Sequence, residues 1–349
     1  MNLDDLGLFK KIDTQNLLAE IDALPNQLQQ AWELGQSLPL PVFADIQNIV
    51  FAGMGDSAVA AELVTASVFS SIRLPVTVHR GYGLPAFANG KQALVVCISH
   101  SDNTEEILDA FETALKNDCQ ILVISTGGEL MKRALAKNIP VWSFEYKGNA
   151  YIAYPFGLLL AFLARQGFTP NPSNYITEAV TAMKISQEHI RAEVVAAQNP
   201  AKRYAGQLVG RWVTFVGTET LAPVARRWKI QVNQFAKAGA NFEVIPEANH
   251  NALTATLNPS QTLNAHTMTL FLRAPSDHSR NRLRSDLMRQ AFMLEGLNTD
   301  VIDARGESVI ANLWTLVLFG DYMAYYLAMA YGSDPSEEDA ILNFKRSLG

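Results

Sequence analysis

Short apolar runs, separated by stretches with apolar side chains at helical spacing, form the hydrophobic pattern of the first half of the chain. The runs span residues 48–53, 74–79, 93–98, 121–125 and 139–144. Short apolar strands that alternate with amphipathic helices are typical of a parallel sheet covered on both faces. Ahead of the first run, residues 13–37 show helical spacing, and Pro39 and Pro41 end that predicted helix.

The same pattern restarts in the second half. Between the halves, residues 154–165 predict a helix, 166–174 a loop and 175–197 a connecting helix. Arg211–Trp228 then repeats the order strand, glycine, helix, with Gly217 in the place of Gly53. The remaining apolar runs and helical patterns lie at 242–245, 267–273, 299–303, 307–331 and 336–347.

This repeat predicts an α/β fold of two similar units in tandem. We expect an N-terminal domain with its leading helix at residues 1–165, a connecting loop and helix at 166–204, and a C-terminal domain at 205–349. Ligands of such sheets bind beyond the carboxyl ends of the strands, so the strand-to-helix loops are where chemistry is expected.

Length and charge narrow the classes of function. The chain has 349 residues, enough for two domains, and its net charge of −6 without a Lys/Arg-rich run argues against a nucleic-acid partner. Asn312, Gly320 and Asp321 interrupt the apolar stretch Val309–Tyr331. That stretch therefore predicts a core helix and not a membrane span.

The cysteines and the N-terminus indicate the compartment. The chain has two cysteines, Cys97 and Cys119, each at the end or the start of a predicted strand. Buried free thiols are typical of a protein in a reducing compartment. The first residues lack the charged-then-apolar pattern of a signal peptide. We expect a cytoplasmic protein.

Two strand-to-helix loops carry small hydroxyl residues, GMGDS at Gly53–Ser57 and SHSDNTEE at Ser99–Glu106. One interpretation is a phosphate cradle, in which backbone N–H groups, a helix N-terminus and hydroxyl groups converge on one anion. The hydroxyls would come from Ser99, Ser101 and Thr104.

The alternative for the second loop is a capped helix. Asp102 with Glu105, or Asn103 with Glu106, fits a capping box. Each loop also contains an aspartate, Asp56 or Asp102, and a carboxylate beside a phosphate is repulsive.

A third segment has a histidine in a polar turn. Glu247 and His250 lie in a Pro-Glu-x-Asn-His-Asn turn after a predicted strand. Such a histidine is either a proton shuttle or a surface residue. The other histidines, His100 among them, do not lie in such a polar turn. No two histidines have metal-ligand spacing, so we expect no metal and no cofactor.

Together these segments resemble the bifunctional phosphoglucose/phosphomannose isomerases, which consist of two sugar isomerase (SIS) domains. The likeness covers nearly the whole chain. The segments that carry it are Gly53–Ser57, Ser99–Glu106, Ala225–Lys237, Pro246–Asn251, Tyr325–Ala328 and Gly332–Lys345.

The resemblance implies two tandem SIS domains, each a flavodoxin-like three-layer sandwich with a parallel sheet between helices. It implies interconversion of aldose and ketose 6-phosphates through a cis-enediolate. It also implies a homodimer, in which His250 of one copy completes the site of its neighbour. From the charge and the interrupted apolar stretch we expect no nucleic-acid or membrane partner.

The same resemblance assigns roles to residues. Phosphate binding falls on a set of hydroxyl residues, Ser57, Ser99, Ser101 and Thr104. Ring opening falls on His250, and Lys345 matches a C-terminal lysine that reaches the same site.

Several positions depart from the family pattern. The proton-transfer glutamate is replaced by Gln234, whose amide cannot abstract a proton. The arginine that stabilises the intermediate is replaced by Ile152. Asp56 and Asp102 replace glycines in the phosphate loops, and Ala252 replaces the glutamate of an Asn-His-Asn-Glu motif.

Three hypotheses follow. The first is an isomerase with a substitute base, for which Glu243 and Glu247 are candidates. The second is a non-catalytic sugar-phosphate binding protein. The third is a binder of a cationic or metal-bridged ligand, in which Asp56 and Asp102 face the pocket.

Overall fold

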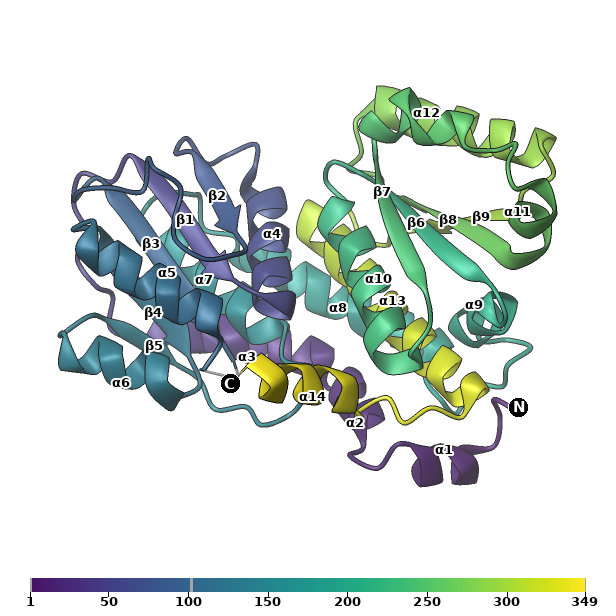
Figure 1. The fold of residues 1–349 in the computed structure, drawn as a ribbon, viewed down its shortest axis with the longest axis horizontal. Helices are drawn as coiled ribbons and strands as arrows, with labels where there is room; N and C mark the ends of the chain where they lie inside the picture. The colour runs from purple at the N-terminus through teal and green to yellow at the C-terminus, as the bar shows by residue number, and fades with distance from the viewer. Residues whose placement is uncertain (1, 101–102, 349) are drawn as a thin grey trace. The chain divides into compact units, whose positions relative to one another are not determined.

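The computed structural model describes residues 2–100 and 103–348, which divide into two compact units (Figure 1). The first unit is Asn26–Thr177, and the second unit combines Met1–Pro25 with Glu178–Gly349. Residues 2–25 group with the second unit because they contact its helices: the Tyr325 hydroxyl donates to Asp13 Oδ2 at 3.1 Å. The SIS-domain limits at 165 and 205 remain predictions.

The first unit contains a five-stranded parallel sheet in the order β2–β1–β3–β4–β5. This is the flavodoxin-like order, whose switch point lies between β1 and β3. The bounds are β1 Asn48–Gly53, β2 Val76–His79, β3 Ala93–Ser99, β4 Gln120–Ser125 and β5 Val141–Ser143. Each predicted run of the first half is therefore confirmed as a strand.

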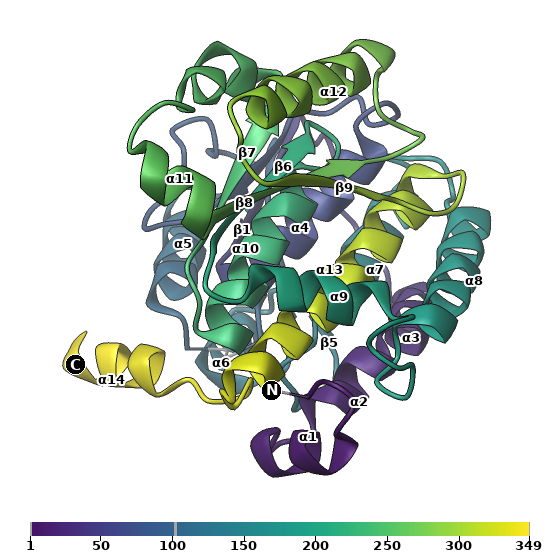
Figure 2. The same ribbon diagram turned by 90° about the vertical axis from the view of Figure 1, so that its right-hand side faces the viewer.

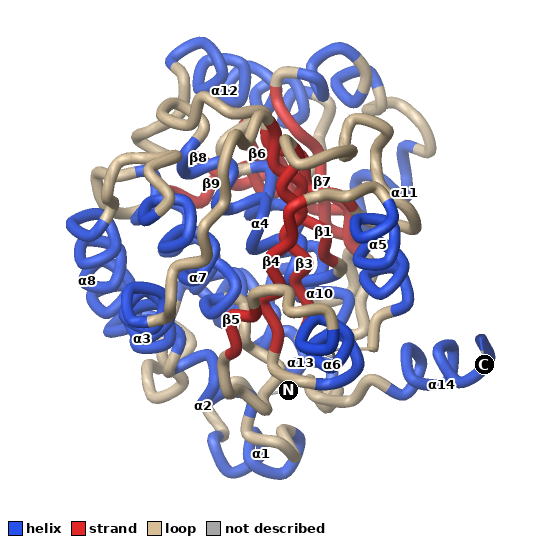
Figure 3. Tube along the Cα trace, turned by 90° about the vertical axis from the view of Figure 1, so that its left-hand side faces the viewer, coloured by secondary structure: helices blue, strands red, loops and turns tan. Residues whose placement is uncertain are grey.

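Helices cover both faces of this sheet (Figure 3). The bounds are α3 Leu24–Ser37, α4 Gly55–Val68, α5 Glu105–Lys116, α6 Gly128–Ala136 and α7 Ala153–Arg165. Helices α4 and α7 contact each other on one face, and α5 and α6 contact each other on the opposite face. Burying the central strands on both sides explains why their sequence is continuously apolar.

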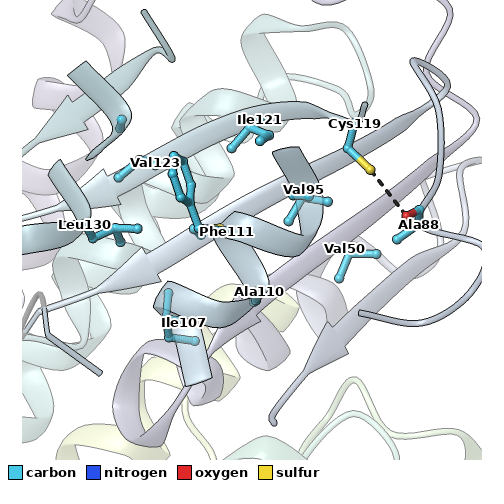
Figure 4. Close-up of a cluster of buried hydrophobic side chains, with 14 of the residues drawn as sticks. Val50, Ala88, Val95, Ile107, Ala110, Phe111, Cys119, Ile121, Val123 and Leu130 are labelled. Atoms are coloured by element: carbon cyan, nitrogen blue, oxygen red, sulfur yellow. Dashed lines mark hydrogen bonds between the residues drawn. The ribbon is translucent and has the colours of Figure 1, made fainter. Parts of the chain in front are cut away.

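Figure 4 shows part of the core between this sheet and α5. Phe111 and Ile107 of α5 pack against Val95 and Val123 of the strands, and all four are almost fully buried. Cys119 is buried, and its Sγ donates to the Ala88 carbonyl oxygen at 3.3 Å. Cys97 is also buried, and both thiols are free, as predicted.

The second unit contains a four-stranded parallel sheet in the order β7–β6–β8–β9 (Figure 2). The strands are β6 Trp212–Thr218, β7 Ala240–Ile245, β8 Thr267–Arg273 and β9 Thr299–Asp303. Helices α10 and α13 lie on one face and α12 on the other.

The helices of this unit are α1 Leu6–Ile12, α2 Leu17–Asp22, α8 Ser173–Ile190 (shared with the first unit at its start), α9 Pro200–Leu208, α10 Ala222–Ala236, α11 Ser260–His266, α12 Ser279–Leu294, α13 Val309–Tyr331 and α14 Asp339–Leu348, with short 3₁₀ helices η1 Glu247–His250 and η2 Ala252–Thr254.

Helix α13 is long and apolar enough to cross a membrane, but 89% of its apolar window is buried inside the protein. The prediction of a core helix is confirmed.

The internal repeat is visible at the strand ends. A Cβ on Gly53 would lie 3.1 Å from the Ala58 nitrogen, and one on Gly217 would lie 2.8 Å from the Leu221 oxygen. In both units the glycine lets the end of the first strand approach the start of the following helix closely.

Two predicted helices are wrong in extent. Residues 13–37 are not one helix: α2 ends at Asp22 and α3 begins at Leu24. The helix predicted at 175–197 starts earlier and ends at Ile190, where the Asn199 side-chain amide donates to the Arg191 carbonyl at 2.9 Å and stabilises a turn.

Candidate active site

The loop from β1 to α4 places the Ser57 hydroxyl at the carboxyl ends of the strands. These strand ends are called here the carboxyl edge of the sheet. Gly55, at a φ of 48°, begins α4, and Asp56 and Ser57 follow in the first helical turn. Ser57 is 3% exposed and Asp56 is 8% exposed. The first turn of a helix has backbone N–H groups without intrahelical acceptors, which favours an anion there. Asp56 adds a negative charge to the same turn.

The loop from β3 to α5 lies beside it. Gly53 pairs with Ile98, so Ser99 is the first residue of β3 beyond the paired end of β1. Ser99 is 4% exposed. Ser57, Ser99 and the N-cap residue Thr104 therefore reach the switch point between β1 and β3, where ligands of such sheets bind.

The capping-box alternative for Asn103 and Glu106 is wrong. The N-cap of α5 is Thr104, and its side chain makes no capping hydrogen bond. Asn103 Oδ1 instead accepts from the Glu129 N–H at 3.3 Å, at the start of α6. Ser101 and Asp102, with the pair Asp102–Glu105, lie outside the described residues.

His100, the residue after Ser99, makes more side-chain and backbone contacts than its place in the sequence indicated. Its ring stacks on Tyr151 at a centroid distance of 4.0 Å and an interplanar angle of 8°. Its Nε2 lies 3.2 Å from the Tyr146 carbonyl oxygen. Thr126 Oγ1 donates to the His100 carbonyl at 2.8 Å, which holds the backbone at this point.

A third loop at the same edge was missed by the sequence reasoning. Ser125 ends β4 and is fully buried, and its register partner is Ser99. Gly127 and Gly128 follow, at φ values of 158° and 60°, and begin α6. A small-residue run directly after an apolar strand was the available signal, the same one that marked the other two loops.

Ile152, which the resemblance places where the family has an arginine, is fully buried and is the N-cap residue of α7. Its neighbour Tyr151 presents the ring on which His100 stacks. In this segment an aromatic ring therefore faces His100, and position 152 itself supplies no cation.

The matching carboxyl edge of the second unit has a different character. Thr218, at the end of β6, donates to Asp277 Oδ1 at 2.5 Å, and Asp277 Oδ2 accepts from the Ala274 N–H at 2.7 Å. Burial raises the pKa of Asp277, while these hydrogen bonds oppose the rise. Asn281 donates to Glu219 at the same edge. Asp277 and Glu219 therefore place two carboxyl groups at this edge, where an ionised carboxylate would repel a phosphate.

His250 ends η1, shortly after the carboxyl end of β7, and its side chain is exposed. Glu247 is also exposed, and its Oε1 accepts from Asn251 Nδ2 at 3.3 Å. Glu243 lies within β7, and burial raises its pKa.

Gln234 lies at the other end of the same sheet. It is in the last turn of α10, which starts at the carboxyl edge and returns to the amino edge. Lys237 Nζ donates to the Gln234 carbonyl at 2.6 Å, and Lys237 lines a pocket of 790 Å³ with Trp212, at the start of β6. The 15 residues of α10 span roughly 20 Å, at a rise of about 1.5 Å per residue. Gln234 and His250 therefore lie at opposite edges of the sheet, separated by about this length.

Lys345 lies on α14, which has no buried residue. Within residues 2–100 and 103–348, no group of three or more His, Cys, Asp or Glu side chains could hold a metal ion.

Comparisons with known proteins agree with this architecture. The model of the bacterial phospho-glucose isomerase C-terminal SIS domain matches residues 197–348. A bifunctional phosphoglucose/phosphomannose isomerase of Caldicellulosiruptor bescii is 32% identical over 93% of this chain and 96% of its own length. One of Aquifex aeolicus is 28% identical over 86% and 90%. The crystal structure of a glucose-6-phosphate isomerase like protein from Thermus thermophilus has a TM-score of 0.63 and 16% identity, and covers 97% of this chain and 98% of that one.

Proposed function

Because this chain belongs to the bifunctional phosphoglucose/phosphomannose isomerase family, we propose that it interconverts the 6-phosphates of glucose or mannose with fructose 6-phosphate. The observation that carries the proposal is the hydroxyl-lined switch point of the first unit, where Ser57, Ser99 and Thr104 reach one edge of the sheet.

In this proposal the phosphate group lies at the N-terminus of α4. The Ser57 and Ser99 hydroxyls donate to its oxygens, and Thr104 and Ser101 complete the cradle. The nearly complete burial of Ser57 and Ser99 means that each hydrogen bond forms in a region of low dielectric constant, where it is stronger than in water. Binding the phosphate fixes the position of the sugar carbon atoms.

The remaining predicted residues belong to the second unit. His250 opens the sugar ring, and Lys345 reaches the same site. Gln234 and His250 lie at opposite edges of one sheet, so a single copy does not present both to one ligand. From the family resemblance we propose a homodimer in the cytoplasm, in which one copy supplies His250 and the other supplies the phosphate site.

A second candidate function is a sugar-phosphate binding protein without catalysis. It is favoured by one observation, that a neutral amide and a buried isoleucine, Gln234 and Ile152, stand where the family has a base and a cation. This candidate keeps the phosphate site and predicts binding without turnover.

A direct experiment separates the two. The purified protein is incubated at high concentration with glucose 6-phosphate, mannose 6-phosphate or fructose 6-phosphate, and the products are quantified by NMR. Interconversion supports the isomerase. Binding in calorimetry without interconversion supports the second candidate, and neither binding nor interconversion refutes both.

A further inference from the structure

We propose that a cavity in the second unit binds a small carboxylate with a short hydrocarbon chain. The cavity has a volume of 230 Å³, and it is lined by α8, α9, α13 and β9 with the loop that follows β9 (Figure 2). Every lining residue belongs to the second unit, whereas the loops proposed to hold the sugar phosphate belong to the first. The inference therefore stands whether or not the protein is an isomerase.

Arg305 supplies the cavity with a cation that has no countercharge. Its backbone is fixed, because its N–H donates to Thr315 Oγ1 at 3.0 Å and its carbonyl oxygen accepts from Asn312 Nδ2 at 3.2 Å. Within residues 2–100 and 103–348, its guanidinium makes no hydrogen bond and no ion pair. A guanidinium with unused N–H groups can hold a carboxylate through two parallel hydrogen bonds.

His189 lines the same cavity from the last turn of α8. Its imidazole makes no hydrogen bond to any residue that the structure describes. The last carbonyl groups of the helix already have donors: the Ile190 oxygen accepts from the Tyr326 hydroxyl at 2.6 Å, and the Arg191 oxygen accepts from Asn199 Nδ2 at 2.9 Å. The imidazole is therefore available as a second donor to an anion.

The other polar groups at the cavity do not cancel this positive charge. Asp303 also lines it, but its two carboxylate oxygens accept from Arg273 Nε at 2.7 Å and Arg273 Nη2 at 3.2 Å. The Tyr204 hydroxyl donates to the Val301 oxygen at 3.3 Å. Burial, and then the nearby Asp300, raise the pKa of Tyr204, so its phenol is neutral at neutral pH. The unbalanced charge among the lining side chains is therefore positive.

An apolar wall faces these polar groups. Ile190, Ile302 and Leu316 line the cavity, and none of them is more than 6% exposed. Each CH₂ group that a ligand buries against such a wall strengthens its binding about fourfold. An anion without hydrocarbon gains nothing from this wall, so the lining favours a ligand with a charged end and an apolar end.

The volume limits the length of the ligand. A water molecule occupies about 30 Å³ in the liquid, so 230 Å³ holds about seven or eight non-hydrogen atoms. A carboxylate of roughly four or five carbon atoms fits this space, whereas a hexose 6-phosphate is about twice as large. The cavity therefore excludes the proposed substrate.

The first test is calorimetry of the full-length protein with butanoate. We expect one site per chain with a Kd of about 0.1–5 mM. Two control ligands separate the two ends of the molecule: acetate keeps the charge with almost no chain, and butan-1-ol keeps the chain without the charge. Each should bind about tenfold more weakly than butanoate, or weaker still.

Substitutions assign the binding to the lining residues. Arg305→Gln should weaken butanoate binding at least tenfold, and Arg305→Lys, which keeps the charge but not the fork, should weaken it less. His189→Gln should weaken it by a smaller factor than Arg305→Gln. Arg280→Gln is the matched control, because Arg280 is exposed on α12 and does not line the cavity. Arg305 and His189 are both exposed, so these variants should keep the wild-type melting temperature.

Two tryptophans report where the ligand lies. Trp228 Nε1 donates to the Leu316 oxygen at 2.9 Å, and the Trp228 ring stacks on Phe319, which lines the cavity, at a centroid distance of 5.8 Å. Trp212 lines the separate pocket of 790 Å³. Butanoate should therefore shift the indole N–H resonance of Trp228 in NMR and leave that of Trp212 unchanged.

Four outcomes would overturn the proposal, and none of them depends on turnover. They are no heat of binding at about 50 mM butanoate, tenfold above the weakest expected Kd, an unchanged affinity in Arg305→Gln, equal affinities for acetate and butanoate, and a shift of Trp212 without one of Trp228. The isomerase proposal is tested by its own product assay, so the failure of one leaves the other standing.

Discussion

A buried ion pair in the second unit gives a stability prediction of calculable size. Arg227 of α10 and Asp321 of α13 are both fully buried, and they form two hydrogen bonds, Nη2–Oδ2 at 2.7 Å and Nε–Oδ1 at 3.1 Å. The substitution Asp321→Asn keeps the shape of the side chain but leaves the guanidinium without this countercharge. Breaking such a pair from one side costs about 3–5 kcal/mol.

The expected change is large enough for a simple assay. For a folded unit of this size, 1 kcal/mol corresponds to about 2–4 °C, so the melting temperature of Asp321→Asn should fall by roughly 6–20 °C. Urea unfolding is followed by tryptophan fluorescence, because Trp228 and Trp314 are fully buried in this unit. Asp303→Asn is the matched control, because it breaks an exposed ion pair with Arg273. The Arg273 side chain is 34% exposed and the Asp303 side chain is 61% exposed, so this substitution should cost less than about 1 kcal/mol.

The double substitution Arg227→Met with Asp321→Leu completes the test. Replacing both charges by apolar groups removes the unpaired charge, so most of the lost stability should return. A single variant Asp321→Asn that loses less than about 1 kcal/mol would contradict the reasoning, because it would mean that the buried guanidinium does not need its carboxylate.

Three further predictions concern the two edges and Gln234. Asp56→Gly should tighten binding of glucose 6-phosphate by tenfold or more in calorimetry. The reason is that a carboxylate about 6 Å from a phosphate costs roughly 3 kcal/mol at an effective dielectric constant of about 20. Asp56→Asn should act in the same direction, and unchanged affinity for both variants would show that the carboxylate does not face the phosphate. Gln234→Glu should change kcat by less than threefold, because Gln234 lies at the amino edge of its sheet, roughly 20 Å from the edge that carries His250. A rise of more than tenfold would return the proton-transfer role to position 234. Burial raises the pKa of Asp277 in the folded state, so its contribution to stability is present below its ordinary value near 3.8 and is lost as the pH rises through the higher folded value. Denaturant unfolding between pH 3 and 8 should show this decline in the wild type, and Asp277→Asn should flatten it; an unchanged slope would refute the assignment.

The sequence predicted the layers of the fold because the signal for them is local. A strand of a covered parallel sheet is apolar at every position, so runs such as 48–53 and 267–273 coincide with β1 and β8. The glycines at 53 and 217 predicted the repeat for a similar reason: each marks one close approach between a strand and the next helix.

The predictions that were wrong concern features that depend on contacts between residues distant in the sequence. The helix predicted at 175–197 ends at Ile190 because a turn is closed by Asn199. Asn103 resembled a helix cap, but its acceptor is used by the N-terminus of α6. Periodicity contains no information on either partner.

The site shows the same limit. The hydroxyls of Ser57 and Ser99 were found because they are next to apolar strands. His100 was passed over as one histidine among several, because the two tyrosines that orient it lie 46 and 51 residues further along the chain. A single sequence contains nothing that pairs those positions.

The most direct test of the account is an NMR measurement on the wild-type protein with glucose 6-phosphate in D₂O. The account predicts that fructose 6-phosphate appears and that recovered glucose 6-phosphate contains deuterium at C2. A spectrum in which the substrate remains unconverted and fully protonated at C2, at high protein concentration, would contradict it.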